Sequence, residues 1–178
     1  MSNYTELKSE SEKRWTQLTS GSIPLVRVGT AMCGLAAGAG QVIDSLKTTL
    51  ASHGVDANIQ EVGCIGLCYA EPIVDIVKGD QSRLFFSNVS PNAVNEIVDR
   101  YLVSNLIPTS NVNILGYLGE EPISTAPNLA TLPGMKLQQR IALRNAGHIS
   151  PMDIYQYIAQ GGYAGLSAAI SDMEPDEV

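Results

Sequence analysis

The sequence predicts an α/β protein, and three observations lead to this prediction. Short β-branched runs alternate with segments of helical periodicity between about residues 23 and 104. Gly and Pro residues separate these segments where turns are expected. The chain of 178 residues is long enough for one full domain and an appendage, because domains commonly hold roughly 100 to 200 residues. We therefore expect one compact α/β domain with further segments at its ends.

The first predicted elements are an amphipathic helix, a strand and a second helix. Residues 4–19 place Leu7, Trp15 and Leu18 at roughly helical spacing among charged residues. Residues 23–28 form a short β-branched run, which predicts a strand that leads into a Gly/Ala-rich loop. The next helix is expected over 39–52, where apolar residues recur at i, i+3 and i+4, namely Val42, Ile43, Leu46 and Leu50.

Three further strands and a helix complete the predicted domain. A strand is expected over 56–62, and the runs 72–77 and 83–87 are typical of a hairpin. A helix should begin after Ser90, with Pro91 at its first position. The resulting order β-α-β-β-β-α can close a small sheet with helices packed on it.

The pattern changes after residue 104. Four prolines interrupt the region 105–134, which we interpret as an extended connector with one strand candidate at 112–118. Two or three short helices are expected beyond it, beginning with the segment 135–147. The predicted organisation is an N-terminal helix (1–21), the α/β domain (22–104), the Pro-rich connector (105–134) and a C-terminal helical region (135–178).

Charge and hydropathy exclude several classes of protein. The net charge is −7 and the sequence pI about 4.7, with no stripe of Lys or Arg, so we expect no nucleic-acid partner. No apolar run approaches the ~20 residues of a spanning helix, and the N-terminus lacks the pattern of a signal or transit peptide. A cytoplasmic protein without membrane insertion is expected.

The three cysteines are the strongest candidates for chemistry. Cys64 and Cys68 form a C-x3-C motif directly after one predicted strand, and Cys33 follows another. An odd number of cysteines without an export signal favours metal or redox chemistry over a disulfide framework. Simple packing is an alternative for Cys33. Zinc is less favoured, because only three thiols are present and a structural zinc site needs four ligands. A thiol redox protein is less favoured, because the motif is not C-x-x-C.

Other polar residues are weaker candidates. Glu71 follows the cysteine turn, where a local salt bridge is favoured over an effect on a bound group. His53 and His148 are expected to be capping or surface residues. Arg140 and Arg144 are expected on one solvated helix face. We find no combination that predicts a Ser-His-Asp site.

The segments VRVGTAMCGLAAGA and EVGCIGLCYAEPIVDI resemble the thioredoxin-like [2Fe-2S] ferredoxin family. Members usually bear C-x4-C in the first loop and C-x3-C in the second, so the resemblance implies that Cys33, Cys64 and Cys68 are the second, third and fourth cluster ligands. The place of the first ligand falls on Val28, or on Gly29 in an alternative register. A non-cysteine atom would then complete the site, from the 30–32 loop or from solvent.

Within this family, the chain resembles the version fused to the flavoprotein, NADH-binding subunit of complex I-like dehydrogenases and of NAD-dependent or electron-bifurcating hydrogenases. The recognisable residues of the tail are Gln139-Arg140, Leu143-Arg144-Asn145 and Gly161-Gly162-Tyr163. In relatives this stretch leads to an FMN-binding loop, whereas no Gly-rich phosphate-binding run occurs before Val178. FMN and NADH are expected only in a downstream region or a partner subunit.

The resemblance implies an electron-transfer module with a [2Fe-2S] cluster inside an NADH-oxidising or electron-bifurcating complex. Its partners would be the flavoprotein and iron–sulfur subunits, and a homodimer is a further arrangement that the sequence allows. No complete catalytic site is expected in this chain. The alternative is a thioredoxin-like docking or assembly domain of the same kind of complex, without a cluster.

Overall fold

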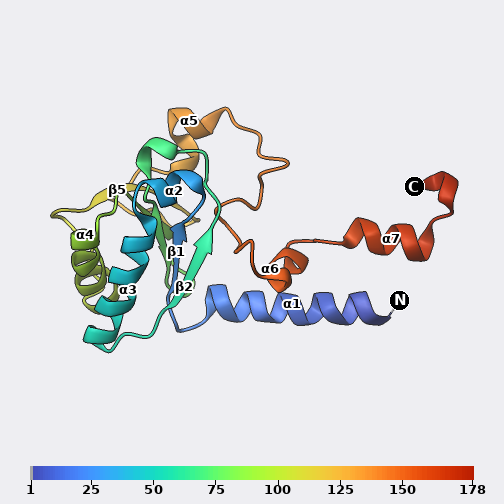
Figure 1. Ribbon diagram of the computed structural model, residues 1–178, viewed down its shortest axis with the longest axis horizontal. Helices are drawn as coiled ribbons and strands as arrows, with labels where there is room; N and C mark the ends of the chain where they lie inside the picture. Colours follow the sequence, from blue (N-terminus) through green and yellow to red (C-terminus); the bar gives the residue numbers. More distant parts are fainter. Residues whose placement is uncertain (1) are drawn as a thin grey trace.

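The computed structural model describes residues 2–178, and its centre is one five-stranded sheet (Figure 1). The strands occur in the order β2-β1-β3-β4-β5. β1 and β2 are parallel, and the other neighbours are antiparallel. The strand bounds are β1 Leu25–Gly29, β2 Asn58–Val62, β3 Val74–Val77, β4 Arg83–Ser87 and β5 Asn113–Leu118. The predicted α/β class is confirmed.

Seven α-helices and several shorter helical turns accompany the sheet in the described chain. The α-helices are α1 Ser2–Ser20, α2 Met32–Ala36, α3 Ala39–His53, α4 Pro91–Glu96, α5 Pro133–Lys136, α6 Ile154–Ala159 and α7 Ala164–Asp172. A π-helical segment, Ile97–Val103, continues α4, and the turns η1 Cys68–Ala70, η3 Leu129–Thr131 and η4 Pro175–Glu177 are 3-10 helical.

The parallel pair β1 and β2 fixes where the cysteine-bearing segments lie. Gly29 at the end of β1 is in register with Val62 at the end of β2. The N–H of Thr30 then donates to the Val62 carbonyl at 3.0 Å, so the pairing continues past the strand. Because parallel strands end at the same edge of a sheet, the segments that follow β1 and β2 leave side by side.

One face of the sheet is an apolar core. Alternate residues of β1, β3 and β4 point to this face, as the two-residue period of a strand requires, and they pack against α3, α4 and the π-helical segment. α3 and α4 lie on the same side of the sheet in Figure 1. The strand residues in this core are Val26, Val28, Val74, Ile76, Leu84 and Phe86.

The opposite face carries a row of charged residues beneath the C-terminal half of the chain. Arg27 of β1, Asp75 of β3 and Arg83 of β4 lie on successive strands. The Asp75 carboxylate accepts one hydrogen bond from Arg27 at 3.1 Å and two from Arg83 at 2.5 and 2.6 Å. Arg27 is only 1% exposed, and burial lowers its pKa to about 10. A buried carboxylate therefore holds two guanidinium groups together.

The turn around residue 147 covers these charges. Arg83 also donates to the Gly147 carbonyl, and the His148 ring packs edge-on against Trp15 of α1 at 5.0 Å between ring centroids. Burial, together with Arg27 and Arg83, lowers the His148 pKa to about 4. The prediction of a capping or surface role for His148 was therefore wrong, because the ring joins two distant parts of the chain.

α1 and the C-terminal helices form an arm that extends from the sheet (Figure 1). α6 lies beside α1. The Arg14 guanidinium lies 3.8 Å from the centre of the Tyr155 ring, and the Tyr4 hydroxyl donates to the Gly162 carbonyl at 2.9 Å. α7 lies beyond α6, away from the sheet, and several of its apolar residues are exposed.

Most predicted elements are present, but one predicted helix is not. The expected N-terminal helix, the five strands and the helices over 39–52 and after Ser90 all form. In 135–147 the helix ends at Lys136 and turns follow. Leu137 and Ile141 are 89% and 80% exposed. Without tertiary burial a segment this short is a marginal helix, so the Arg140 and Arg144 side chains do not share a helix face.

The predicted connector contributes a strand to the main sheet. β5 pairs with β4: Leu118 lies opposite Arg83 at one end, and Asn113 lies opposite Ser87 at the other. The register shifts between Phe85 and Phe86 of β4. The division of the sequence into four regions stays a prediction. Among the described residues, no helix combines the length and the apolar character needed to cross a membrane.

We predict that Asp75→Asn destabilises the protein by about 3 to 5 kcal/mol, because it leaves buried Arg27 without its counter-charge. Asp80→Asn, at an exposed position on the turn between β3 and β4, is the matched control and should change the free energy of unfolding by less than about 0.5 kcal/mol. Urea denaturation of both variants measures this difference. Equal stabilities would mean that the charged row does not support the fold.

We also predict that acid destabilises the protein partly through His148. The pKa of this ring is below its unfolded value of about 6.5, so the unfolded state binds the proton first. Stability is therefore full above pH 6.5 and falls as the pH is lowered toward 4. His148→Gln should reduce this loss in the free energy of unfolding by about 2 kcal/mol at pH 4.5. His53→Gln, which replaces a histidine at an exposed position, is the matched control, and urea denaturation across this pH range measures both variants.

Candidate metal centre

The three cysteines meet at one edge of the sheet. Their sulfur atoms all lie within 4.8 Å of one another, and the Sγ atoms of Cys64 and Cys68 are 3.7 Å apart. All three thiols are free. The proximity predicted from the two strands is thus present, although Cys33 is separated from the C-x3-C motif by 30 intervening residues.

Different local structures position the three thiols. Cys33 lies in the first turn of the short helix α2, rather than in the loop expected from the sequence. Cys64 follows β2, and Cys68 begins the η1 turn. Gly66 between the latter two has φ of 94°, a conformation that favours glycine. This conformation lets the chain turn tightly enough to bring Cys64 and Cys68 together.

A backbone amide points at one sulfur. The Gly66 N–H donates to Cys64 Sγ at 3.2 Å. Burial nevertheless raises the pKa of the Cys64 thiol to about 12, and this effect exceeds that of the amide, which favours the thiolate. A bound metal ion would favour the thiolate over the thiol.

Glu71 is a buried neighbour of the thiols. It is 5% exposed. Its Oε2 accepts a hydrogen bond from the Ile73 N–H at 2.7 Å, and its Oε1 lies 4.0 Å from Cys33 Sγ. Burial raises the pKa of this carboxyl. The expected local salt bridge was wrong, since none of the ion pairs among the described residues includes Glu71.

The Glu71 carboxylate lies directly over Gly29. A Cβ atom on Gly29 would lie 2.7 Å from Oε2 and 2.8 Å from Oε1. These distances are shorter than van der Waals contacts, so the carboxylate fills the space that a side chain at position 29 would need. Position 29 is one of the two places where the family pattern puts its first cysteine.

The donor set suits a thiolate-binding metal or cluster. Two thiolates on one tetrahedral metal, with bonds of about 2.3 Å, lie roughly 3.7 Å apart, which equals the observed separation of Cys64 and Cys68. Soft sulfur ligands select iron–sulfur clusters, zinc or Cu(I). Three thiols alone leave a four-ligand site one donor short.

The centre lies near the protein surface. Cys68 is exposed, while Cys33 and Cys64 are partly buried. Apolar residues flank the cysteines in sequence and are unusually accessible: the exposed fractions are 87% for Met32, 57% for Leu35 and 74% for Tyr69. These three apolar side chains are therefore accessible from solvent near the cysteines.

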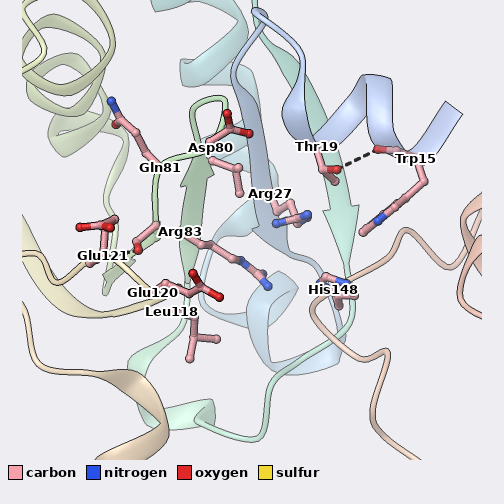
Figure 2. Close-up of a pocket in the computed structure, with 13 residues that line it drawn as sticks. Trp15, Thr19, Arg27, Asp80, Gln81, Arg83, Leu118, Glu120, Glu121 and His148 are labelled. Atoms are coloured by element: carbon pink, nitrogen blue, oxygen red, sulfur yellow. Dashed lines mark hydrogen bonds between the residues drawn. The ribbon is translucent and has the colours of Figure 1, made fainter. Parts of the chain in front are cut away.

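A separate cavity of about 590 Å³ lies over the charged face of the sheet. Figure 2 shows Arg27, Arg83 and His148 on its inner side, with Trp15 and Thr19 of α1 at one wall. Asp80, Gln81, Glu120 and Glu121 line the other wall. None of the three cysteines contributes to this cavity.

The sequence identified the three thiols but neither the buried charged row nor the direction of the Glu71 side chain. Arg27 and Asp75 were missed, although each is a charged residue inside an otherwise apolar strand run, LVRVG and VDIV. A charged residue in such a run is buried and therefore needs a partner. Glu71 was a candidate, but no local pattern indicates that its side chain turns toward Gly29 and Cys33.

Comparisons with known proteins find partial similarity to a hydrogenase subunit and to two solved structures. No family model matches it. It is 27% identical over 92 residues to the NADP-reducing hydrogenase subunit HndB of Solidesulfovibrio fructosivorans, over 48% of this chain and 73% of that protein. It is also similar to two structures of thioredoxin-like [2Fe-2S] ferredoxin from Aquifex aeolicus. The first has 18% identity and a TM-score of 0.45 and covers 57% of this chain and 96% of that one. The second has 19% identity and a TM-score of 0.38, and the match covers 50% of this chain and 99% of that one.

Proposed function

We propose that this protein is an electron-transfer module in which Cys33, Cys64 and Cys68 hold a [2Fe-2S] cluster. The observation that carries the proposal is the meeting of three free thiols within 4.8 Å at one edge of the sheet. Segments far apart in the sequence supply them, so their proximity is a property of the fold. A bound [2Fe-2S] cluster accepts and donates one electron at a time.

The surroundings of the thiols support this role. The Gly66 N–H donates to Cys64 Sγ, and hydrogen bonds to cluster sulfurs are one of the means by which a protein sets the reduction potential. The exposed position of Cys68 allows a second redox centre to approach the site. Met32, Leu35 and Tyr69 supply an apolar rim where a partner protein can dock.

The proposal extends to a multi-subunit redox complex in the cytoplasm. The similarity to a subunit of an NADP-reducing hydrogenase supports this setting. The tail resembles the start of a flavoprotein subunit, and we place FMN and NADH in such a subunit or in a region downstream. The arm of α1, α6 and α7 would contact these partners. A homodimer stays a prediction.

A docking domain without a cluster is the second candidate. The observation that favours it is the exposed apolar surface of the C-terminal region, where Leu166 and Ile170 of α7 are 55% and 74% exposed. This surface is independent of the thiols. Both roles can coexist in one chain, but only the electron-transfer role requires the three sulfurs to meet.

The test measures the iron content, the sulfide content and the visible absorption of the full chain. The protein is produced together with iron–sulfur assembly proteins and purified anaerobically. We expect about two iron and two sulfide per chain. Cys64→Ser should lose the colour, whereas Tyr69→Ser, an exposed position in the same turn, should keep it. A colourless protein without iron contradicts the electron-transfer role. Zinc in place of iron and sulfide contradicts it as well.

Partner binding separates the two candidates further. Under the docking role, Cys64→Ser should bind the flavoprotein subunit as tightly as the unsubstituted chain. Under the electron-transfer role, the flavoprotein subunit with NADH should bleach the cluster of the unsubstituted chain, and Cys64→Ser, which lacks the colour, should show no such bleaching.

A further inference from the structure

We infer that the Glu71 carboxylate is the fourth ligand of the metal centre, in the place of the missing cysteine. The inference rests on the proposed function, because it assigns a ligand to the cluster proposed there. Glu71 is three residues beyond Cys68, and its side chain turns back over the site. The sequence predicts a donor from the 30–32 loop or from solvent, whereas Glu71 lies outside that loop.

The first argument is the position of the carboxylate. Oε1 lies 4.0 Å from Cys33 Sγ, and both oxygens lie within 2.8 Å of the place where a Cβ of residue 29 would be. A cysteine at position 29 would project its sulfur from that same point. The carboxylate therefore occupies the region from which the family's first ligand would reach the cluster.

The second argument is charge. Glu71 is 5% exposed. Its hydrogen-bond donors are the Ile73 N–H and the Cys33 thiol, and none of the ion pairs among the described residues includes it. A buried carboxylate without a cation costs several kcal/mol in real proteins. A ferric ion in the site would supply the missing positive charge. Oε2 is held by the Ile73 N–H, so Oε1 is the oxygen left for the metal.

The third argument is how the donors pair. Cys64 and Cys68 are 3.7 Å apart, as expected for two ligands of one tetrahedral metal. The remaining sulfur, Cys33, has the Glu71 oxygen at a similar distance of 4.0 Å. The site thus provides two pairs of donors, and a [2Fe-2S] cluster needs two protein ligands on each iron.

Other candidate donors are exposed or are engaged elsewhere. The Met32 side chain is 87% exposed. His148 packs against Trp15 over the charged face, and His53 is at the exposed end of α3, where its Nδ1 lies 2.9 Å from the Thr49 carbonyl oxygen. Among the described residues, Glu71 is the buried oxygen donor beside the thiols.

The test compares clusters in the full chain and in Glu71 variants. Glu71→Ala should lower bound iron and sulfide about 10-fold or more under limiting iron, since even the loss of an outer-shell partner costs 10- to 100-fold in metal affinity. Glu61→Ala, at an exposed position of β2, is the matched control and should retain the cluster. Circular dichroism of each apoprotein shows whether the variant is folded.

A ligand exchange tests the spatial argument directly. In the double variant Gly29→Cys with Glu71→Ala, the removed carboxylate leaves room for a Cβ and a thiol at position 29. We expect this variant to recover the iron and sulfide lost in Glu71→Ala. The matched control, Gly29→Ala with Glu71→Ala, fills the same space without a donor and should remain depleted.

Spectroscopy identifies the ligand without depending on stability. In protein labelled with ¹³C at the glutamate carboxylate, the reduced cluster should show ¹³C hyperfine coupling in pulsed EPR, and Glu71→Gln should abolish it. Glu71→Cys should shift the reduction potential to a more negative value, because thiolate donates more electron density than carboxylate.

The outcomes distinguish the two proposals. An unsubstituted chain without iron and sulfide overturns the proposed function itself. An unsubstituted chain with a cluster, whose iron content, EPR spectrum and potential are unchanged in Glu71→Ala, overturns only the assignment of Glu71. The assignment is also overturned if Glu71→Ala loses iron and sulfide, but the unsubstituted chain shows no ¹³C coupling and the exchange variant recovers no cluster. Glu71 would then be a structural residue.

Discussion

The parallel pairing of β1 and β2 is the constraint on which the thiol site depends. The strands are separated by the whole of α3, yet Gly29 and Val62 end in register at one edge of the sheet. The chain leaves both strands there, so Cys33 and Cys64 are brought together without a disulfide or any local sequence proximity. The apolar packing of α3 against the sheet keeps this register, since a slip of one residue would turn Val26 and Val28 out of the core.

The polar face of the sheet ties the rest of the chain to the same edge. Arg83 holds both Asp75 and the Gly147 carbonyl, and Gly147 lies against Ile65, between the two cysteines of the C-x3-C motif. The turn at 147 therefore contacts the charged row on one side and the cysteine segment on the other. Through His148 and Trp15, this contact continues into α1.

The helices, the strands and the candidate thiols could be predicted from the sequence because each depends on a local pattern of residues. Helical and two-residue periodicities predicted α3, the hairpin of β3 and β4 and the strand β5, and the motif spacing predicted Cys64 and Cys68 as a pair. The role of His148 and the direction of the Glu71 side chain could not be predicted, since both depend on contacts between distant segments. The helix expected over 135–147 failed for a related reason: local periodicity exists there, but the fold offers it no surface to bury against.

The close contact between Gly29 and Glu71 also restricts how such a site can change during evolution. The two positions share one volume, so a side chain at 29 displaces the Glu71 carboxylate from its present place. Under the proposed ligand role of Glu71, neither single replacement is neutral: a new side chain at 29 moves the carboxylate, and a small residue at 71 leaves the site one donor short. Homologous chains should therefore fall into two groups, one with a small residue at 29 and a carboxylate at 71, the other with cysteine at 29 and a small residue at 71. Intermediates between these groups should be rare.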